Sequence, residues 1–234
     1  MTKILASIKD EYEAEIISKF DFNIIDIKNV NDGALGYVGD SSLKKITEIF
    51  SDRTLSVTAG NDSSPLTKEQ VRRVDLLEHL GIEYIKIGIF DSNLLHEHSY
   101  FLKSIKKYTI KTVGVIFADL INNVQELEKI LKLNYDGLMI DTVSKNNKST
   151  LDILSGDILK FFVESCRKSG KFCGISGSIK PTRFEDALSL QPDFIGLRGA
   201  LCSNSKREDI DSMICQDILK NFKLINQRIY REVV

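Results

Sequence analysis

Eight short strand-like runs, each followed by an amphipathic helical stretch, predict an α/β protein with a single (β/α)8 TIM barrel over residues 1–234. No Pro/Gly-rich linker or low-complexity segment interrupts the alternation, which favours one domain. An open doubly wound sheet is the alternative, but it usually stops at about five or six strands and often carries a glycine-rich first turn. The turn after the first predicted strand, SIKDEY, contains no glycine.

The individual elements follow from hydrophobic periodicity, taken in chain order. Short apolar, β-branched runs predict strands over residues 3–8, 23–28, 54–58, 84–87, 112–117, 137–141, 172–176 and 194–198. Apolar positions recurring at helical spacing predict helices over residues 11–20, 42–50, 68–80, 94–107, 124–133, 158–169, 182–188 and 214–225. One helix therefore follows each strand, as the barrel requires.

Composition limits the partners of this chain. Its 32 basic and 33 acidic residues give a net charge of -1, so no field favours nucleic acid or an anionic membrane. No segment approaches the ~20 apolar residues of a membrane-spanning helix. The apolar stretch in the start MTKILASIKDEY is too short for a signal peptide. We expect a cytoplasmic protein that acts on a small molecule and that could form a homo-oligomer.

No metal or organic cofactor is expected. The four cysteines, Cys166, Cys173, Cys202 and Cys215, form no CxxC pair and have no histidine at zinc-site spacing, so reduced thiols are the simpler interpretation. In the triplet HEH, His96 and His98 point in different directions on a helix, and we expect both on its surface. No P-loop, GxSxG, HExxH or dinucleotide-binding fingerprint is present.

Charged residues inside apolar strands give the main functional signal. Asp26 and Lys28 share one face of the second predicted strand, Lys86 lies in the fourth, and Asp141 ends the sixth. Burying a lysine costs several kcal/mol unless it is paired or neutralised. A lysine at a strand end can simply point into solvent, but even-numbered strands of a barrel contribute to common layers, so these groups could meet around one cavity.

Such a constellation indicates amine catalysis. A lysine among cations and apolar walls loses proton affinity, and its neutral amine can attack a carbonyl to form an imine. Lys28 and Lys86 suit the two amine roles, while Asp26 and Asp141 could orient them and move protons. Lys145, in the loop after Asp141, could reach over the same mouth or remain solvated.

A second signal lies after the last two predicted strands, in GISGSIK and IGLRGA. Loops at these positions bind phosphate in many barrels through backbone amides, and small residues allow the anion to approach. We therefore expect a phosphate group near these loops, although glycine and serine turns are also common in ordinary loops. The candidate phosphate-binding residues are Ser176, Gly177, Ser178, Arg198 and Gly199.

Six motifs in order, IIDIKN, GALG, YIKIGI, MIDTVSK, ISGSIK and GLRGALC, resemble those of the (5-formylfuran-3-yl)methyl phosphate synthase family of methanofuran-type cofactor biosynthesis. The resemblance spans nearly the whole chain. It implies a TIM-barrel lyase that condenses two glyceraldehyde 3-phosphate molecules into a furan aldehyde phosphate, releasing phosphate and water. By similarity, Lys28 forms the Schiff base and Lys86 accepts the proton.

The chain departs from the family pattern in the loop after the second strand, where Val30 and Ala34 stand in place of the usual proline and serine. The loop at residues 30–39, expected to cover the site, could therefore differ in detail. Two other functions stay open at this point: another class I aldolase acting on sugar phosphates, and a non-catalytic phosphate-binding barrel. Which of the lysines is the nucleophile is also open, since coupled amines share their titration.

Overall fold

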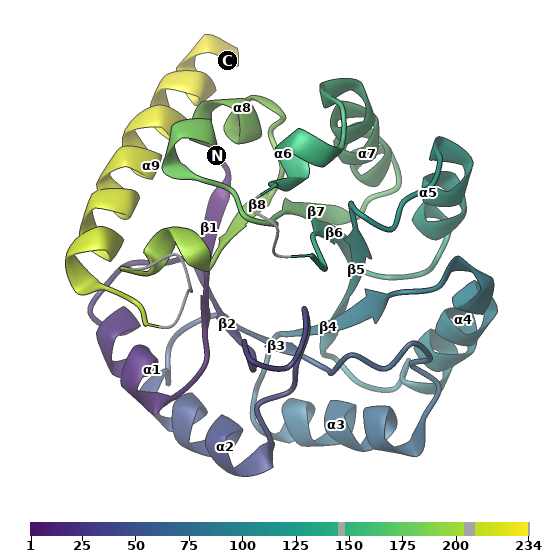
Figure 1. The fold of residues 1–234 in the computed structure, drawn as a ribbon. Helices are drawn as coiled ribbons and strands as arrows, with labels where there is room; N and C mark the ends of the chain where they lie inside the picture. Colours follow the sequence, from purple (N-terminus) through teal and green to yellow (C-terminus); the bar gives the residue numbers. More distant parts are fainter. Residues whose placement is uncertain (145–147, 204–208, 234) are drawn as a thin grey trace.

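The computed structural model describes residues 1–144, 148–203 and 209–233. Eight parallel strands close into a barrel in the order β1 to β8, and helices surround it (Figure 1). The predicted barrel is confirmed, and the last strand pairs with the first. The strands are β1 (Lys3–Ile8), β2 (Ile24–Ile27), β3 (Leu55–Thr58), β4 (Tyr84–Ile89), β5 (Lys111–Phe117), β6 (Gly137–Asp141), β7 (Phe172–Ile175) and β8 (Phe194–Leu197).

Polar caps set where several helices begin. The side chains of Asp10, Thr67 and Asn123 accept hydrogen bonds from backbone N–H groups in the first turns of α1, α3 and α5. The helices are α1 (Glu11–Ile17), α2 (Asp40–Ile49), α3 (Lys68–His79), α4 (Leu95–Ser104), α5 (Val124–Leu131), α6 (Thr150–Ile153), α7 (Gly156–Lys168), α8 (Phe184–Ser189) and α9 (Ser212–Val233). Short 3₁₀ turns occupy η1 (Ser92–Leu94), η2 (Pro181–Arg183) and η3 (Gly199–Leu201).

The expected helices are present with ends that shift by up to three residues, and two differences are larger. A short helix, α6, precedes α7, and the last helix, α9, begins and ends outside the predicted residues 214–225. The extension of α9 carries the buried Ile229 onto the barrel side, so packing continues past the predicted end.

Apolar side chains form two separate clusters. The larger lies between the strands and the surrounding helices, and the smaller fills the barrel interior with residues such as Leu5, Val113, Met139 and Phe194. The interior also holds buried polar groups, among them Ser7, Asp26, Ser56 and Lys86. The barrel therefore has a polar interior layer in addition to its apolar one.

The expectation that both histidines of the HEH triplet lie on the surface was wrong for His98. Its side chain is 0% exposed, and its Nδ1 and the hydroxyl of the buried Tyr135 share a hydrogen bond of 2.6 Å. His96 is exposed, as expected. Within the described residues, no helix combines the length and the apolar character needed to cross a bilayer.

Candidate active site

A buried ion pair lies inside the barrel. Lys86 Nζ on β4 is 2.7 Å from Asp26 Oδ1 on β2, and their side chains are 4% and 1% exposed. The hydroxyl of Ser7, paired with Asp26 in the β1–β2 register, donates to Asp26 Oδ2 at 2.8 Å. Because each group has a partner of opposite sign or a hydrogen-bond donor, these contacts offset part of the cost of burying the pair away from water.

Lys28 follows β2 by one residue and lies at the carboxyl mouth of the barrel. Its backbone N–H donates to Ile8 at 2.9 Å, which extends the pairing with β1, and its side chain is 6% exposed. Lys28 Nζ donates to the carbonyl oxygen of Ala34 at 3.1 Å. The loop after β2 therefore folds back over the residue that precedes it, as expected for a cover.

A small pocket surrounds this lysine. Its wall includes Lys28, Asp141, Ser176, Gly177, Ser178 and Arg198. Seven of the residues predicted from the sequence, these six and Gly199, are thus brought to one cavity at the mouth. Their common position follows from the parallel barrel, which places the carboxyl ends of all strands on the same side.

Asp141 and the loop after β7 are held together. Asp141 Oδ2 accepts a hydrogen bond from the Ser176 hydroxyl at 3.1 Å, and its Oδ1 accepts from the Thr142 backbone N–H at 2.7 Å. Thr150, the first residue of α6, donates its hydroxyl to the Ser176 carbonyl at 2.6 Å and its N–H to the Gly177 carbonyl at 3.0 Å. Helix α6, which sequence reasoning missed, therefore supports one wall of the pocket.

Arg198 directly follows β8, and its guanidinium is directed toward α1. Arg198 Nη2 is 2.8 Å from Glu13 Oε1, Nη1 contacts Glu13 Oε2, and Nη1 also donates to the Ser7 carbonyl at 3.3 Å. Both side chains are buried. Glu13, a partner that sequence reasoning missed, thus balances the charge of Arg198. An anion bound in the pocket would lie near an arginine whose charge is already paired with a carboxylate.

The two lysines line different cavities. Lys86 contributes to a second cavity, together with Ser56, Tyr84, Phe172 and Phe194, among residues near the amino-terminal ends of the strands. Lys28 lines the pocket at the opposite end. The expected single cavity for both amines is therefore replaced by an arrangement in layers, with the Asp26–Lys86 pair inside the barrel and Lys28 at its mouth.

Three further expectations from the sequence concern Lys145, the four cysteines and metal binding. Lys145 lies outside the described residues. All four cysteines are buried and none forms a disulfide. Among residues 1–144, 148–203 and 209–233, no group of three or more His, Cys, Asp or Glu side chains is arranged to hold a metal ion.

Several solved structures have a fold similar to this one. The 3-hexulose-6-phosphate synthase of Salmonella typhimurium superposes with a TM-score of 0.67 and 13% identity over 96% of this chain and 100% of that chain. Phosphoribosyl anthranilate isomerase from Thermus thermophilus gives a TM-score of 0.65 with 10% identity, again over 96% of this chain and 100% of that one. At such identities the likeness shows the fold alone.

Sequence relatives are closer. A protein of Methanococcus maripaludis strain C5 named (5-formylfuran-3-yl)methyl phosphate synthase is 31% identical, over 93% of this chain and 96% of its own. A protein of the same name from Methanosarcina acetivorans is 28% identical over 93% and 97%. One from Methylorubrum extorquens, named as a putative synthase of this type, is 24% identical over 88% and 84%. A family model described as 4-HFC-P synthase matches residues 4–222, and the chain therefore belongs to the 4-HFC-P synthase family.

Proposed function

We propose that this protein is a (5-formylfuran-3-yl)methyl phosphate synthase that condenses two glyceraldehyde 3-phosphate molecules through a Schiff base on Lys28. Membership of the family and relatives of that name support the reaction. The observation that carries the site assignment is the position of the Lys28 amine, buried at the barrel mouth in the same pocket as Asp141 and the Ser176–Ser178 loop. We assign a protein with this activity to methanofuran-type cofactor biosynthesis.

The proposed chemistry begins with the neutral Lys28 amine. Its nitrogen bonds to the aldehyde carbon, the carbonyl oxygen leaves as water, and an imine forms. The imine withdraws electrons, so the neighbouring carbon can lose a proton and attack the aldehyde of a second substrate molecule. Hydrolysis of the carbon–nitrogen bond then returns the free Lys28 amine, and loss of one phosphate and two water molecules leaves an aromatic furan aldehyde that keeps one phosphate.

We assign the proton transfers to the Asp26–Lys86 pair and to Asp141. Asp26 and Lys28 point to the same face of the β2 backbone two residues apart, which separates their Cα atoms by about 7 Å along the strand and places the pair one layer below Lys28. An amine and a carboxylate 2.7 Å apart can accept and return a proton between them. Asp141, held by Ser176 and Thr142, lies on the opposite wall of the pocket.

Phosphate recognition is assigned to the two loops after β7 and β8. Ser176, Gly177, Ser178 and Gly199 contribute hydroxyl and backbone groups to the pocket that contains Lys28. Arg198 adds a guanidinium whose charge is largely balanced by Glu13, so we assign it an orienting part rather than the main attraction for the anion. Lys145 completes the proposed set from the loop after Asp141.

The test traps the imine and identifies the product. Protein incubated with glyceraldehyde 3-phosphate and borohydride is digested and mapped, while product without borohydride is identified by mass and absorbance. We expect an adduct on Lys28 and a furan aldehyde phosphate, with both lost in Lys28→Gln and retained in the exposed-site control Lys44→Gln. An adduct with a different product would identify another aldolase. Binding without an adduct would identify a non-catalytic barrel.

A further inference from the structure

The loop that follows Lys28 is folded into a closed turn. Asn29 donates its N–H to the Gly36 carbonyl at 2.8 Å, and these two residues form an antiparallel bridge. Between them lies the segment 32–35, which contains Ala34, whose carbonyl accepts from Lys28 Nζ. The position of the Lys28 amine therefore depends on what holds this segment in place.

Asn61, in the loop after β3, holds the segment from both sides. Its Oδ1 accepts a hydrogen bond from the Leu35 N–H at 2.9 Å, and its Nδ2 donates to the Asp32 carbonyl at 2.6 Å. The neighbouring Gly60 N–H donates to the Leu35 carbonyl at 2.9 Å. One carboxamide thus satisfies both a donor and an acceptor of the turn, on either side of Ala34.

The backbone of the turn leaves room for this side chain. Gly33 has a φ of +63°, and a Cβ placed on it would lie 2.8 Å from Asn61 Oδ1. A residue with a side chain would meet both a left-handed conformation and a steric clash at this position. The glycine and the asparagine are therefore matched to each other.

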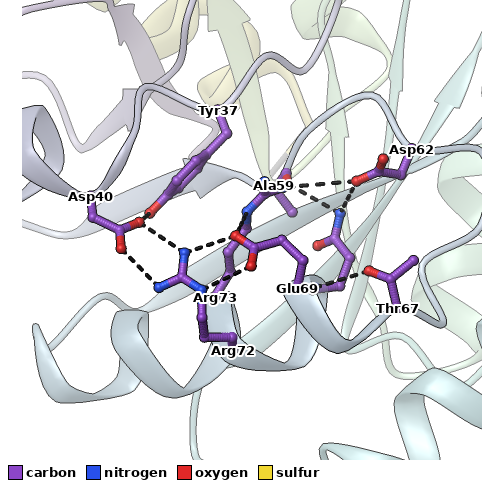
Figure 2. A network of polar contacts seen from close by, with 9 residues as sticks. Tyr37, Asp40, Ala59, Asp62, Thr67, Glu69, Arg72 and Arg73 are labelled. Carbon is purple, nitrogen blue, oxygen red and sulfur yellow. Dashed lines mark hydrogen bonds and ion pairs between the residues drawn. The ribbon is translucent and has the colours of Figure 1, made fainter.

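The loop that carries Asn61 is itself anchored to α3, as Figure 2 shows. The carbonyl of Ala59 accepts hydrogen bonds from Gln70 Nε2 at 3.1 Å and from Arg73 Nη1. The Arg73 guanidinium also stacks on the ring of Tyr37, 4.6 Å from its centroid, and thereby binds the far end of the covering loop. Both loops are thus tied to one rigid helix.

We propose that Asn61 is a positioning residue for Lys28: it clamps the segment 32–35 so that the Ala34 carbonyl fixes the amine at the barrel mouth. The use of that amine for imine formation rests on the proposed function. A long lysine side chain must give up rotational freedom about several bonds to hold one geometry. If a reacting group is misplaced by about 1 Å, the reaction can slow by about 100-fold. Asn61 would restrict the Lys28 side chain in this way without contacting the substrate.

The experiment compares Asn61→Ala with Asn23→Ala. Asn23 is a matched control, because its Oδ1 also accepts a backbone N–H at 2.9 Å, that of Ile4, but at the amino-terminal end of the barrel. Two rates are measured on Lys28 by peptide mapping: borohydride trapping with saturating glyceraldehyde 3-phosphate, and acylation by acetic anhydride, which needs no substrate. Acylation of the deeper Lys86 reports general loosening of the fold.

In Asn61→Ala we expect trapping to fall at least tenfold and acylation of Lys28 to rise severalfold, with Lys86 acylation unchanged. Asn23→Ala should change neither rate on Lys28. Gly33→Ala should reproduce the Asn61→Ala phenotype, and the double variant should be no worse than the poorer single one, since the shared contact is already lost. Independent, multiplying effects of Gly33→Ala and Asn61→Ala would overturn the clamp.

The two proposals fail in different ways. If the wild-type protein binds the aldehyde yet forms no adduct, the proposed function is wrong, and acylation of Lys28 in Asn61→Ala still decides the clamp. If the wild-type protein forms the adduct and Asn61→Ala traps it at the same rate with unchanged acylation, the function holds and the positioning role is refuted.

Discussion

Removing one member of the buried Asp26–Lys86 pair should destabilise the protein far more than removing both. At 2.7 Å the Coulomb attraction is about 6 kcal/mol for an effective dielectric constant of about 20, and the cost of desolvating two ions offsets much of it. Asp26→Asn leaves a buried ammonium beside a neutral amide, and Lys86→Met leaves a buried carboxylate that keeps the hydrogen bond from Ser7. We expect each to lower the free energy of unfolding by about 3 to 5 kcal/mol.

The double variant Asp26→Asn/Lys86→Met leaves neither member of the pair charged, and methionine fills most of the lysine volume. We expect it to lose only about 1 to 2 kcal/mol, so that the two single changes are coupled by several kcal/mol. Urea denaturation at neutral pH, followed by circular dichroism, gives all four free energies, and equal m-values across the series show that the unfolding transition is the same.

An exposed pair gives the matched control. Lys111 Nζ and Glu83 Oε1 are 3.0 Å apart, but their side chains are 50% and 39% exposed. The corresponding cycle, Glu83→Gln and Lys111→Met, should show a coupling below about 1 kcal/mol. Additive losses at Asp26 and Lys86, with a coupling no larger than that of the exposed pair, would refute the view that these charges depend on each other inside the barrel.

Two further predictions concern buried ionisable groups outside the pocket. Burial lowers the pKa of His98 to about 4, below its usual value near 6.5, so between these values the folded protein keeps it neutral while the unfolded chain takes up a proton. The free energy of unfolding should therefore fall by up to about 3 kcal/mol as the pH drops from about 6.5 to 4. Urea denaturation of His98→Leu across the same range should show a smaller loss. Glu13→Gln removes the carboxylate paired with Arg198 and should cost about 3 kcal/mol in the same assay, whereas Glu11→Gln, on the exposed side of the same helix, should cost less than about 0.5 kcal/mol.

Local sequence patterns predicted the fold because every strand is a short apolar run and every connection is long enough for a helix. The same patterns located the mouth of the barrel, since Lys28, Ser176 and Arg198 each follow a strand by one residue and Asp141 ends one. Contacts between distant segments could not be read in this way. Glu13 and Arg198 are 185 residues apart in sequence and meet only because β8 closes against β1. The role of Asn61 likewise depends on two loops that fold onto each other.

His98 was misplaced for a different reason, because the sequence did contain the relevant signal. It precedes Phe101 by three residues, Leu102 by four and Ile105 by seven, and these three side chains are buried. That spacing places His98 on the apolar face of α4 rather than on its surface. The burial then requires a polar partner, which Tyr135 supplies from a residue 37 positions away.

Because the two lysines lie in different layers, we expect them to act at different steps of the reaction. In the proposed mechanism, imine formation uses Lys28 and the aldehyde, whereas the proton transfer assigned to the Asp26–Lys86 pair comes after the imine. The double variant Asp26→Asn/Lys86→Met, expected to remain folded, should therefore still give a borohydride adduct on Lys28 while furan product falls by about 100-fold or more. Mass spectrometry of the trapped peptide and absorbance of the product measure the two steps separately. If the double variant forms no adduct although it binds the aldehyde, the buried pair is needed for imine formation itself, and the assignment of Lys86 to a later step is wrong.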